Sequence, residues 1–416
     1  MWITALLAAA ATQAAPGAPP NFLIILLDDV GRDKVRAYGD QPNCQPTPNM
    51  DALAARGVLF RNAWSYQSCS PTRAALLTGR HSDRTGIGSV ILSGDGVYTP
   101  LSTAETTLPD ALPTYTSVAL GKWHLSDQGD PPTHPLDSGF DAVSGFLGPN
   151  DFFSWDWNLN GTVTPRTGYY PTELATQTMG VLDRVEEPFF VYYSPKFAHA
   201  PYHTPPSILH SQPNSNSAII QHMAMSESID TIVGRILSHV DLERTYVFLL
   251  GDNGSPGSTV AHPFEQGKVK GSLYEGGLRV PMIVAGPGVA QGMECDGLVH
   301  VTDYFATILS LAGQAPTTSG AEDSIDFAPL LGDPSLQGAR NTLYVHRFPF
   351  PGTTGQRMRA LRTKRWKLIE NRTSGMFQLY DLSVDPFENN DLLVTQPGPI
   401  TTRMKNRLLA LMPTFP

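Results

Sequence analysis

Two pairs of oxygen-bearing side chains stand after apolar segments of the chain. Asp28 and Asp29 follow the apolar run 22–27, and Asp252 and Asn253 come shortly after the run 246–250. Carboxylate and amide oxygens are the ligands that Ca²⁺ and Mg²⁺ prefer. Either pair alone is more simply explained as a helix cap or as solvated acids. Two such pairs at the ends of predicted strands indicate a site for a divalent metal.

Cys69 begins the segment Cys-Ser-Pro-Thr-Arg-Ala-Ala-Leu-Leu-Thr-Gly-Arg, residues 69–80. Pro71 favours the first turn of a helix and Gly79 favours its end, so we expect Cys69 just ahead of a helix N-terminus. Free N–H groups and the helix dipole favour an anion at that position. A lone cysteine is more often buried and unreactive, so its position alone does not make Cys69 a nucleophile.

Cationic and titratable groups follow two further apolar runs. Lys122 and His124 come after the run 116–120, and a loop with His199 and His203 comes after the run 189–193. Lysine can neutralise an oxyanion, and histidine can donate or accept a proton at neutral pH. Taken singly, each of these residues is an ordinary surface lysine or a histidine with a satisfied hydrogen bond.

The four apolar runs have the length and composition of buried parallel strands. Helical patterns lie between them, at residues 50–56 and 226–240. Alternation of strands and helices predicts an α/β fold with a large mixed, mostly parallel sheet flanked by helices. Ligands bind beyond the carboxyl ends of the strands in such sheets, so we expect the polar groups that follow the four runs to meet there.

The character of the sequence changes after about residue 335. Short β-like runs at 359–368 and 377–382 precede an amphipathic helical pattern at 402–412. These patterns predict a small antiparallel sheet with a closing helix. The expected division is therefore a catalytic domain at 21–335 and a C-terminal α+β subdomain at 336–416.

Composition limits the classes of partner. The 416 residues are 41% hydrophobic and 16% charged, which is typical of a globular protein with a large core. A net charge of −9 disfavours non-specific binding to nucleic acid. Three cysteines, an odd number, leave at least one unpaired, and a Cys44–Cys295 disulfide and free thiols are both compatible with the sequence.

The first residues are apolar and rich in alanine, from position 3 to position 15, and a proline-rich stretch follows. This run is too short to span a bilayer comfortably and ends in small residues, so we expect a signal peptide at about 1–15 and a secreted or periplasmic mature chain. No Lys or Arg precedes the run, which departs from the usual signal, and a lipid-facing anchor is the alternative. No later segment has the composition of a membrane span.

The segment 69–80 resembles the signature of the sulfatases, a family in which the cysteine is oxidised to formylglycine. Motifs with family counterparts occur in the family's order at 21–29, 47–54, 121–125, 251–254, 270–281 and 379–382. Thr72 stands where serine is commonest and keeps the hydroxyl. The resemblance implies an alkaline-phosphatase-like fold, hydrolysis of sulfate esters, and a formylglycine-generating maturation enzyme as a partner.

The resemblance also implies roles for individual positions. The metal ligands would be Asp28, Asp29, Asp252 and Asn253, with formylglycine at position 69 completing the shell. All-oxygen ligands favour Ca²⁺ or Mg²⁺ over Zn²⁺, and the family favours Ca²⁺.

The remaining matched positions surround the substrate. Arg73, Lys122 and His124 would lie around the formylglycine, and Lys122 and Lys270 would bind the sulfate. His199 would protonate the leaving alcohol, because its spacing to the two following prolines fits the family better than that of His203 does. A hydroxyl of the hydrated aldehyde would attack sulfur, and His124 would take up a proton when sulfate is released.

Two other functions share these features. Some phosphonate and phosphate monoester hydrolases of the same superfamily also carry formylglycine, and an inactive relative could hold sulfated glycans without cleaving them. The complete set of catalytic residues argues against the inactive alternative. The substrate expected from the resemblance is a sulfated small molecule or glycan.

Overall fold

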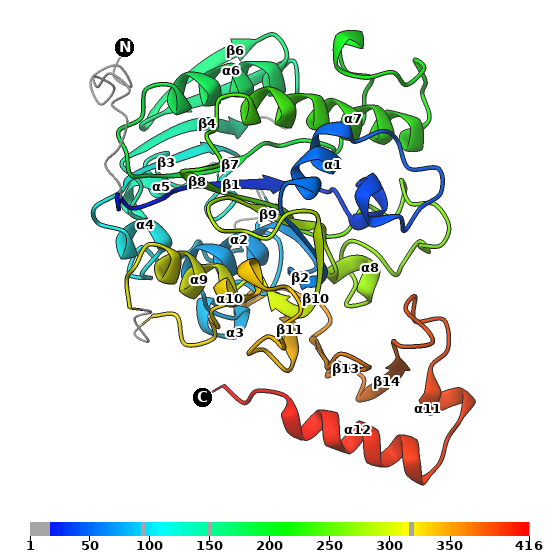
Figure 1. The fold of residues 1–416 in the computed structure, drawn as a ribbon. Helices are drawn as coiled ribbons and strands as arrows, with labels where there is room; N and C mark the ends of the chain where they lie inside the picture. Colours follow the sequence, from blue (N-terminus) through cyan, green and yellow to red (C-terminus); the bar gives the residue numbers. More distant parts are fainter. Residues whose placement is uncertain (1–16, 93–96, 128, 149–150, 316–319, 416) are drawn as a thin grey trace.

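The structure is a computed structural model, and it describes residues 17–92, 97–127, 129–148, 151–315 and 320–415. The predicted signal peptide at about 1–15 lies outside the described residues. The chain forms a ten-stranded sheet and a separate four-stranded sheet (Figure 1). None of the helices in the described ranges combines the length and the apolarity that crossing a membrane requires.

The four strands predicted from apolar runs lie side by side at the centre of the large sheet. They are β3 (Thr116–Gly121), β7 (Phe189–Ser194), β1 (Asn21–Leu27) and β8 (Thr245–Gly251), and they pair in parallel in that order. On the β3 side the sheet continues with β4 (Ala142–Gly148), β5 (Ser154–Leu159) and β6 (Thr162–Thr167). On the β8 side it continues with β9 (Met282–Ala285), β2 (Val58–Trp64) and β10 (Met293–His300). Antiparallel pairings involve β9, β5 and β6, so the expected mixed, mostly parallel sheet is confirmed.

Strand β1 contributes side chains to hydrophobic cores on both faces of the sheet. Phe22, Ile24 and Leu26 join the core that includes α2 (Cys69–Thr78) and α9 (Asp303–Leu311). The alternate residues 23, 25 and 27 join the core that includes α1 (Pro48–Ala55), α6 (Tyr170–Leu182) and α7 (Ala218–Leu237). Figure 1 shows these two groups of helices on opposite sides of the sheet. A strand covered on both faces is apolar along its whole length, which explains why the run 22–27 does not alternate.

Two elements differ most from the ranges predicted. Helix α7 begins at Ala218, well before the predicted start at Ser226. In its first turns Ile219 is exposed and His222 is buried, so the apolar residues there do not mark the buried face. The run 359–368 is not continuous but is divided between β12 (Met358–Arg362) and β13 (Trp366–Asn371). A turn closed by a hydrogen bond from Thr363 N–H to the carbonyl of Trp366 separates these two strands.

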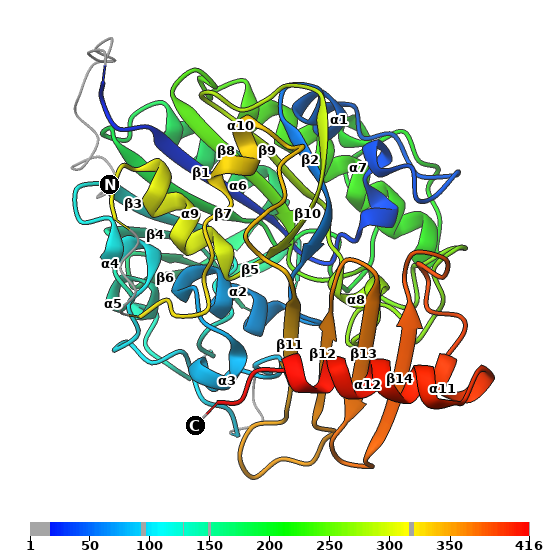
Figure 2. The same ribbon diagram turned by 60° about the horizontal axis from the view of Figure 1, so that its bottom comes forward.

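The small sheet consists of β11 (Leu343–Arg347), β12, β13 and β14 (Met376–Asp381), all antiparallel. Figure 2 shows these strands side by side, with α12 (Pro399–Leu411) lying across them. The expected antiparallel sheet and closing helix are thus confirmed. Buried Glu275, in α8 (Glu275–Leu278), accepts hydrogen bonds from Arg362 and Lys367 of this sheet. Because a buried charge without its partner is strongly destabilising, this cluster fixes the small sheet against the chain around α8.

All three cysteines are free thiols, so the alternative of a Cys44–Cys295 disulfide is not realised.

Candidate active site

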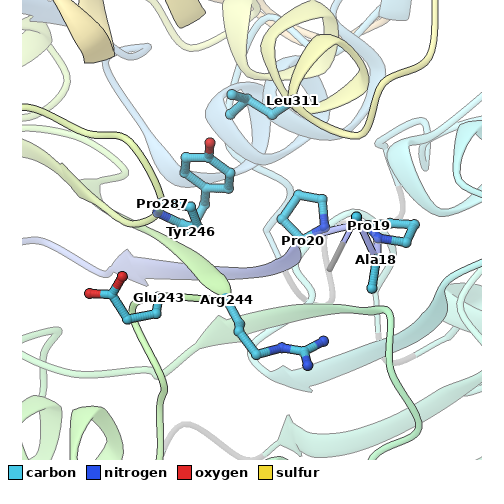
Figure 3. A pocket seen from close by; sticks show the side chains of 9 residues that line it. Ala18, Pro19, Pro20, Glu243, Arg244, Tyr246, Pro287 and Leu311 are labelled. Carbon is cyan, nitrogen blue, oxygen red and sulfur yellow. The ribbon is translucent and has the colours of Figure 1, made fainter. Parts of the chain in front are cut away.

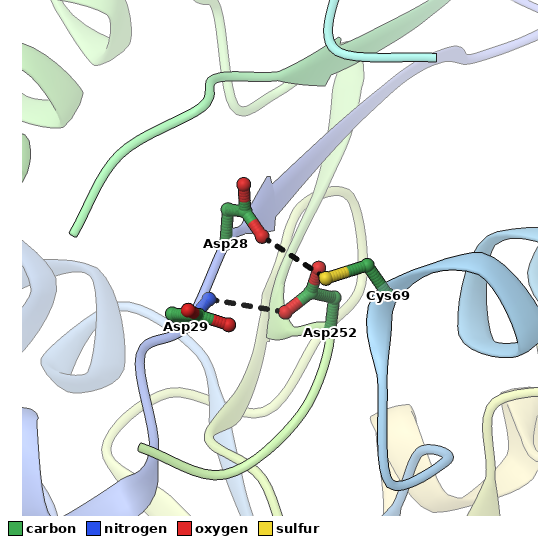
Figure 4. A group of neighbouring side chains, drawn as sticks. All are labelled: Asp28, Asp29, Cys69 and Asp252. Carbon is green, nitrogen blue, oxygen red and sulfur yellow. Dashed lines mark hydrogen bonds between the residues drawn. The ribbon is translucent and has the colours of Figure 1, made fainter. Parts of the chain in front are cut away.

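Strand ends and one helix bring the predicted polar residues together. Asp28 and Asp29 follow β1, Asp252 follows β8, and Cys69 is the first residue of α2. Each of these four side chains has a potential ligand atom within 4.8 Å of the others, and all four residues are buried (Figure 4). The expected convergence at the carboxyl ends of the strands is therefore present in the fold.

Helix α2 begins at Cys69 itself. The sequence had predicted that the helix would begin just after this residue. Pro71 is accommodated because a proline in the first helical turn lacks only an N–H group that would have no partner there. The Sγ atom of Cys69 lies 3.4 Å from Asp28 Oδ1 and 3.4 Å from Asn253 Oδ1. Burial and the negative charge of Asp252 raise the pKa of the Cys69 thiol. Since the thiolate is the reactive form of cysteine, the unmodified residue is a poor nucleophile.

The three carboxylates of this cluster fit a divalent cation. Burial and neighbouring Asp28 raise the pKa of Asp252 to about 7. Burial also acts to raise the pKa of Asp28 and of Asp29, but the nearby cations Lys122 and Lys270 lower both overall. Buried carboxylates this close repel one another, and a hard cation with oxygen ligands relieves that repulsion. An oxygen in place of the Cys69 sulfur would make every donor in the cluster a hard ligand.

Asp29 is held in an unusual backbone conformation. Its φ of 62° is in the left-handed region, as are the φ angles of His124 (59°) and Ala198 (57°) in the neighbouring loops. Such conformations in residues other than glycine occur where surrounding contacts hold them. The N–H of Asp29 donates to Asp252 Oδ1 at 3.1 Å, and its carbonyl lies 3.2 Å from Nε2 of buried His222. Sequence reasoning gave His222 no role, because its place against Asp29 depends on how α7 packs.

Arg73 lies inside the site and orients its parts. It is fully buried and donates to the carbonyl of Lys122 at 2.8 Å and to Asp252 Oδ2 at 3.1 Å. It also donates to the hydroxyl of Ser194, at the end of β7. Arg73 thus connects α2 with the carboxyl ends of three different strands, β3, β7 and β8. Ser194 was not predicted, since serine at a strand end carries no distinctive signal.

Two lysines lie beside the cluster. The Nζ of Lys122 lies 2.9 Å from Asp28 Oδ2, and the Nζ of Lys270 forms an ion pair with Asp29. Lys270 Nζ is also 4.0 Å from Cys69 Sγ. Burial alone would lower the pKa of Lys122, but the charge of Asp28 raises it overall. Both side chains are therefore cations placed next to residue 69.

The two histidines of the loop after β7 lie in different surroundings. His199 Nδ1 lies 2.7 Å from the carbonyl of Ala200, and its Nε2 lies 4.0 Å from Asp29 Oδ2. His203 instead places Nε2 3.1 Å from the hydroxyl of Tyr169 and packs against the ring of Phe152. The fold brings His199, and not His203, to the acidic cluster.

His124 is a neutral histidine with one free ring nitrogen. Its Nε2 lies 2.8 Å from the carbonyl of Ile91 and must carry the proton of that hydrogen bond. Its Nδ1 is buried and has no hydrogen-bond partner among the described residues. Burial and the positive charge of Lys122 hold the pKa of His124 well below its usual value. The arrangement leaves a lone pair on Nδ1 that can accept a proton.

A separate cavity of about 360 Å³ lies at the opposite end of the sheet, where β1 and β8 begin (Figure 3). Its lining includes Pro19, Pro20, Glu243, Arg244 and Tyr246. Its one acidic and one basic residue do not resemble the convergent cluster at the other end. The cluster around Cys69 is therefore the stronger candidate for the active site.

Comparison with known proteins agrees with this geometry. The profile of the family described as Sulfatase matches residues 20–314, and that described as N-sulphoglucosamine sulphohydrolase, C-terminal, matches residues 268–413. The chain is 33% identical to N-acetylgalactosamine-6-sulfatase of Canis lupus familiaris, over 79% of this chain and 70% of that protein. It is 28% identical to arylsulfatase A of Homo sapiens, over 93% of this chain and 86% of that protein.

A solved structure extends the similarity to the fold. The structure of Ps i-CgsB in complex with k-i-k-neocarrahexaose superimposes with a TM-score of 0.79 at 26% identity, covering 94% of this chain and 92% of that one. The Sulfatase profile match spans most of the chain, and this solved structure has the same architecture. The chain therefore belongs to the sulfatase family, within the alkaline-phosphatase-like superfamily, and is an enzyme that hydrolyses sulfate esters.

Proposed function

We propose that this sulfatase acts through formylglycine, formed from Cys69 by a maturation enzyme, and through one Ca²⁺ ion held by Asp28, Asp29, Asp252 and Asn253. The observation that carries the proposal is the buried cluster of three carboxylates around a thiol whose raised pKa makes it a poor nucleophile. When present, hydrated formylglycine supplies a hydroxyl nucleophile, and the metal supplies positive charge for the sulfate oxygens. Mg²⁺ is the alternative ion.

The side chains of this chain would divide the remaining work. Lys122 and Lys270 would bind the sulfate oxygens, since both are cations beside residue 69. Arg73 would hold Asp252 and the chain after β3 in position. His199 would protonate the leaving oxygen, and the free Nδ1 of His124 would accept a proton when sulfate is released.

The substrate we propose is a sulfated sugar. One relative, N-acetylgalactosamine-6-sulfatase, is named for a sulfated sugar. The structure of Ps i-CgsB was solved in complex with k-i-k-neocarrahexaose. The apolar start of the sequence supports a secreted or periplasmic location, where such glycans occur. The division into a catalytic domain at 21–335 and a subdomain at 336–416 is part of the same proposal.

Sulfate should be strongly preferred over phosphate. We expect kcat/KM for 4-nitrophenyl sulfate to exceed that for 4-nitrophenyl phosphate by about 100-fold or more, equivalent to roughly 2.7 kcal/mol of transition-state binding. A phosphate monoester carries a second negative charge near neutral pH, and buried Asp28, Asp29 and Asp252 disfavour it. The measurement is steady-state kinetics on enzyme coexpressed with a maturation system. Equal or higher turnover of the phosphate would favour the phosphate monoester hydrolase alternative.

The roles of the two loop histidines should separate with the leaving group. His199→Ala should lower kcat/KM for a sugar sulfate by about 10²- to 10⁴-fold, but much less for an activated aryl sulfate whose phenolate leaves unaided. His203→Ala is the matched control from the same loop, because His203 packs on Phe152 and Tyr169 rather than on the acidic cluster. It should cost less and show no dependence on the leaving group. A steeper dependence in His203→Ala would exchange the two assignments.

A further inference from the structure

A cavity beside the catalytic cluster is formed jointly by the main domain and the small sheet. It has a volume of about 360 Å³, and residues 267 and 270–274 form one side of it. The other side is formed by the small sheet, through Arg347 of β11, Met358 of β12, Ile369 of β13 and, in the loop between β11 and β12, Gln356. Its volume lies at the lower end of the range for small-ligand pockets, about 300–1,000 Å³, which suits one sugar unit.

The cavity adjoins the position proposed for the sulfate. Lys270 lines it, and the Nζ of this residue lies 4.0 Å from Cys69 Sγ. The next residue, Gly271, accepts a hydrogen bond from Arg347 Nη1 at 2.7 Å and donates from its N–H to the carbonyl of Gln67 at 2.8 Å. Gly271 has a φ of 86°, a left-handed conformation that favours glycine. The cavity is thus joined through Gly271 to the segment just before Cys69.

The charge of the lining is positive, although the whole chain has a net charge of −9. Among the residues that the structure describes, Lys270 and Arg347 line the cavity and no aspartate or glutamate does. Arg347 forms no ion pair with a described residue, and the carbonyl of Gly271 is its one side-chain hydrogen-bond partner among them. Burial lowers the pKa of Arg347, and no acidic neighbour offsets this effect. A half-buried guanidinium without a counter-ion is available to an anionic ligand.

The other lining groups suit a carbohydrate. The partly exposed side chains of Tyr274 and Met358 supply apolar surface for the faces of a sugar ring. Gln356 is exposed and can exchange hydrogen bonds with sugar hydroxyls. A ring with hydroxyl groups and one negative charge matches all of these features.

We propose that this cavity binds the sugar next to the sulfated one, and that Arg347 recognises an oxyanion, a carboxylate or a second sulfate, on that neighbour. The inference rests on the proposed action on sulfated sugars and narrows the substrate to glycans with charge on adjacent units. Arg347 is then a specificity-determining residue contributed by the small sheet. An ion pair supported by a hydrogen bond in a partly buried site is expected to change kcat/KM by about 10- to 100-fold.

The test compares three disaccharides that share an N-acetylgalactosamine 6-sulfate unit. The neighbouring unit is a uronate in the first, its carboxyl-reduced neutral form in the second, and the reduced form with one sulfate in the third. In the wild type, kcat/KM for at least one charged disaccharide should exceed that for the neutral one. Arg347→Ala should lower this ratio about 10- to 100-fold, mainly through KM, and Arg347→Lys should recover part of it. The charged disaccharide that responds identifies the source of the oxyanion.

Arg372→Ala is the matched control, since Arg372 is an exposed arginine beside the same small sheet that does not line the cavity. It should leave the ratio unchanged. Equal wild-type rates on charged and neutral disaccharides would overturn the proposal. So would an equal loss on all three in Arg347→Ala, which would show that the arginine only holds Gly271. Wild-type activity on 4-nitrophenyl sulfate is measured alongside. If the wild type did not hydrolyse 4-nitrophenyl sulfate, the proposed hydrolysis itself would be refuted. If it did, and Arg347→Ala left the ratio of charged to neutral disaccharide turnover unchanged, only the subsite would be refuted.

Discussion

Cys69→Ala is expected to lower kcat for sulfate esters by about 10⁴-fold or more, because the proposal makes residue 69 the source of the nucleophile. The substitution removes one small side chain from the first turn of α2, where alanine is a good helix former. We therefore expect the fold to survive, with a melting temperature close to that of the wild type. The measurement is single-turnover and steady-state kinetics on 4-nitrophenyl sulfate.

Cys44→Ala is the matched control for this variant. Cys44 is a free cysteine in the segment before α1, and its Sγ lies 3.9 Å from Gln45 Oε1, away from the acidic cluster. It should keep wild-type activity after coexpression with the maturation system. If Cys69→Ala kept more than a few per cent of wild-type kcat while folded, the nucleophile would have to be a different residue.

Removal of the metal site should have the second largest effect. Asp252→Asn and Asp252→Ala should lower kcat/KM by about 10³-fold, the equivalent of roughly 4 kcal/mol of charge stabilisation. Asp252 is fully buried and binds Asp29 N–H and Arg73, so the asparagine variant preserves its shape while removing its charge. Chelation of the wild type should abolish turnover, and added Ca²⁺ should restore it.

The metal itself provides a readout that does not depend on turnover. Elemental analysis should find one Ca²⁺ per wild-type chain and little in the Asp252 variants, and Ca²⁺ should raise the melting temperature of the wild type only. Asp183→Asn is the control, since Asp183 is a surface carboxylate paired with His239. Wild-type metal content and activity in Asp252→Ala would contradict the proposed site. Stoichiometric Zn²⁺ in the native protein would contradict the choice of ion.

The centre of the fold could be predicted from the sequence because burial on both faces leaves an unmistakable apolar run. β1, β3, β7 and β8 are such strands, and parallel pairing puts their carboxyl ends at one edge. The residues that follow them then meet without any knowledge of loop structure. The convergence of Asp28, Lys122 and Asp252 follows from this topology alone.

Features that depend on packing between distant elements could not be predicted. His222 contacts Asp29 because of how α7 lies over the sheet, and a polar residue buried in the first turns of α7, where Ile219 is exposed, is not what the sequence pattern predicts. The link between Arg347 and Gly271 needs the small sheet to be docked in one particular place, which Glu275 secures through Arg362 and Lys367. No pattern within the segment around residue 347 indicates that contact.

The separation of His199 from His203 combines both kinds of information. Spacing to the following prolines favoured His199, and the structure places its Nε2 near Asp29 while His203 turns toward Tyr169. The sequence alone left the choice open, because two histidines four residues apart in a loop can each be directed either way. The left-handed conformation of Ala198, just before His199, is part of what directs this loop.

The central claim is that residue 69 of the active enzyme is formylglycine, and mass spectrometry of the tryptic peptide 62–73 tests it most directly. In an active preparation this peptide should be lighter than its cysteine form and should react with a hydrazide. Its modified fraction should rise in proportion to specific activity when the maturation enzyme is coexpressed. A fully active enzyme in which residue 69 is entirely unmodified cysteine would contradict the account.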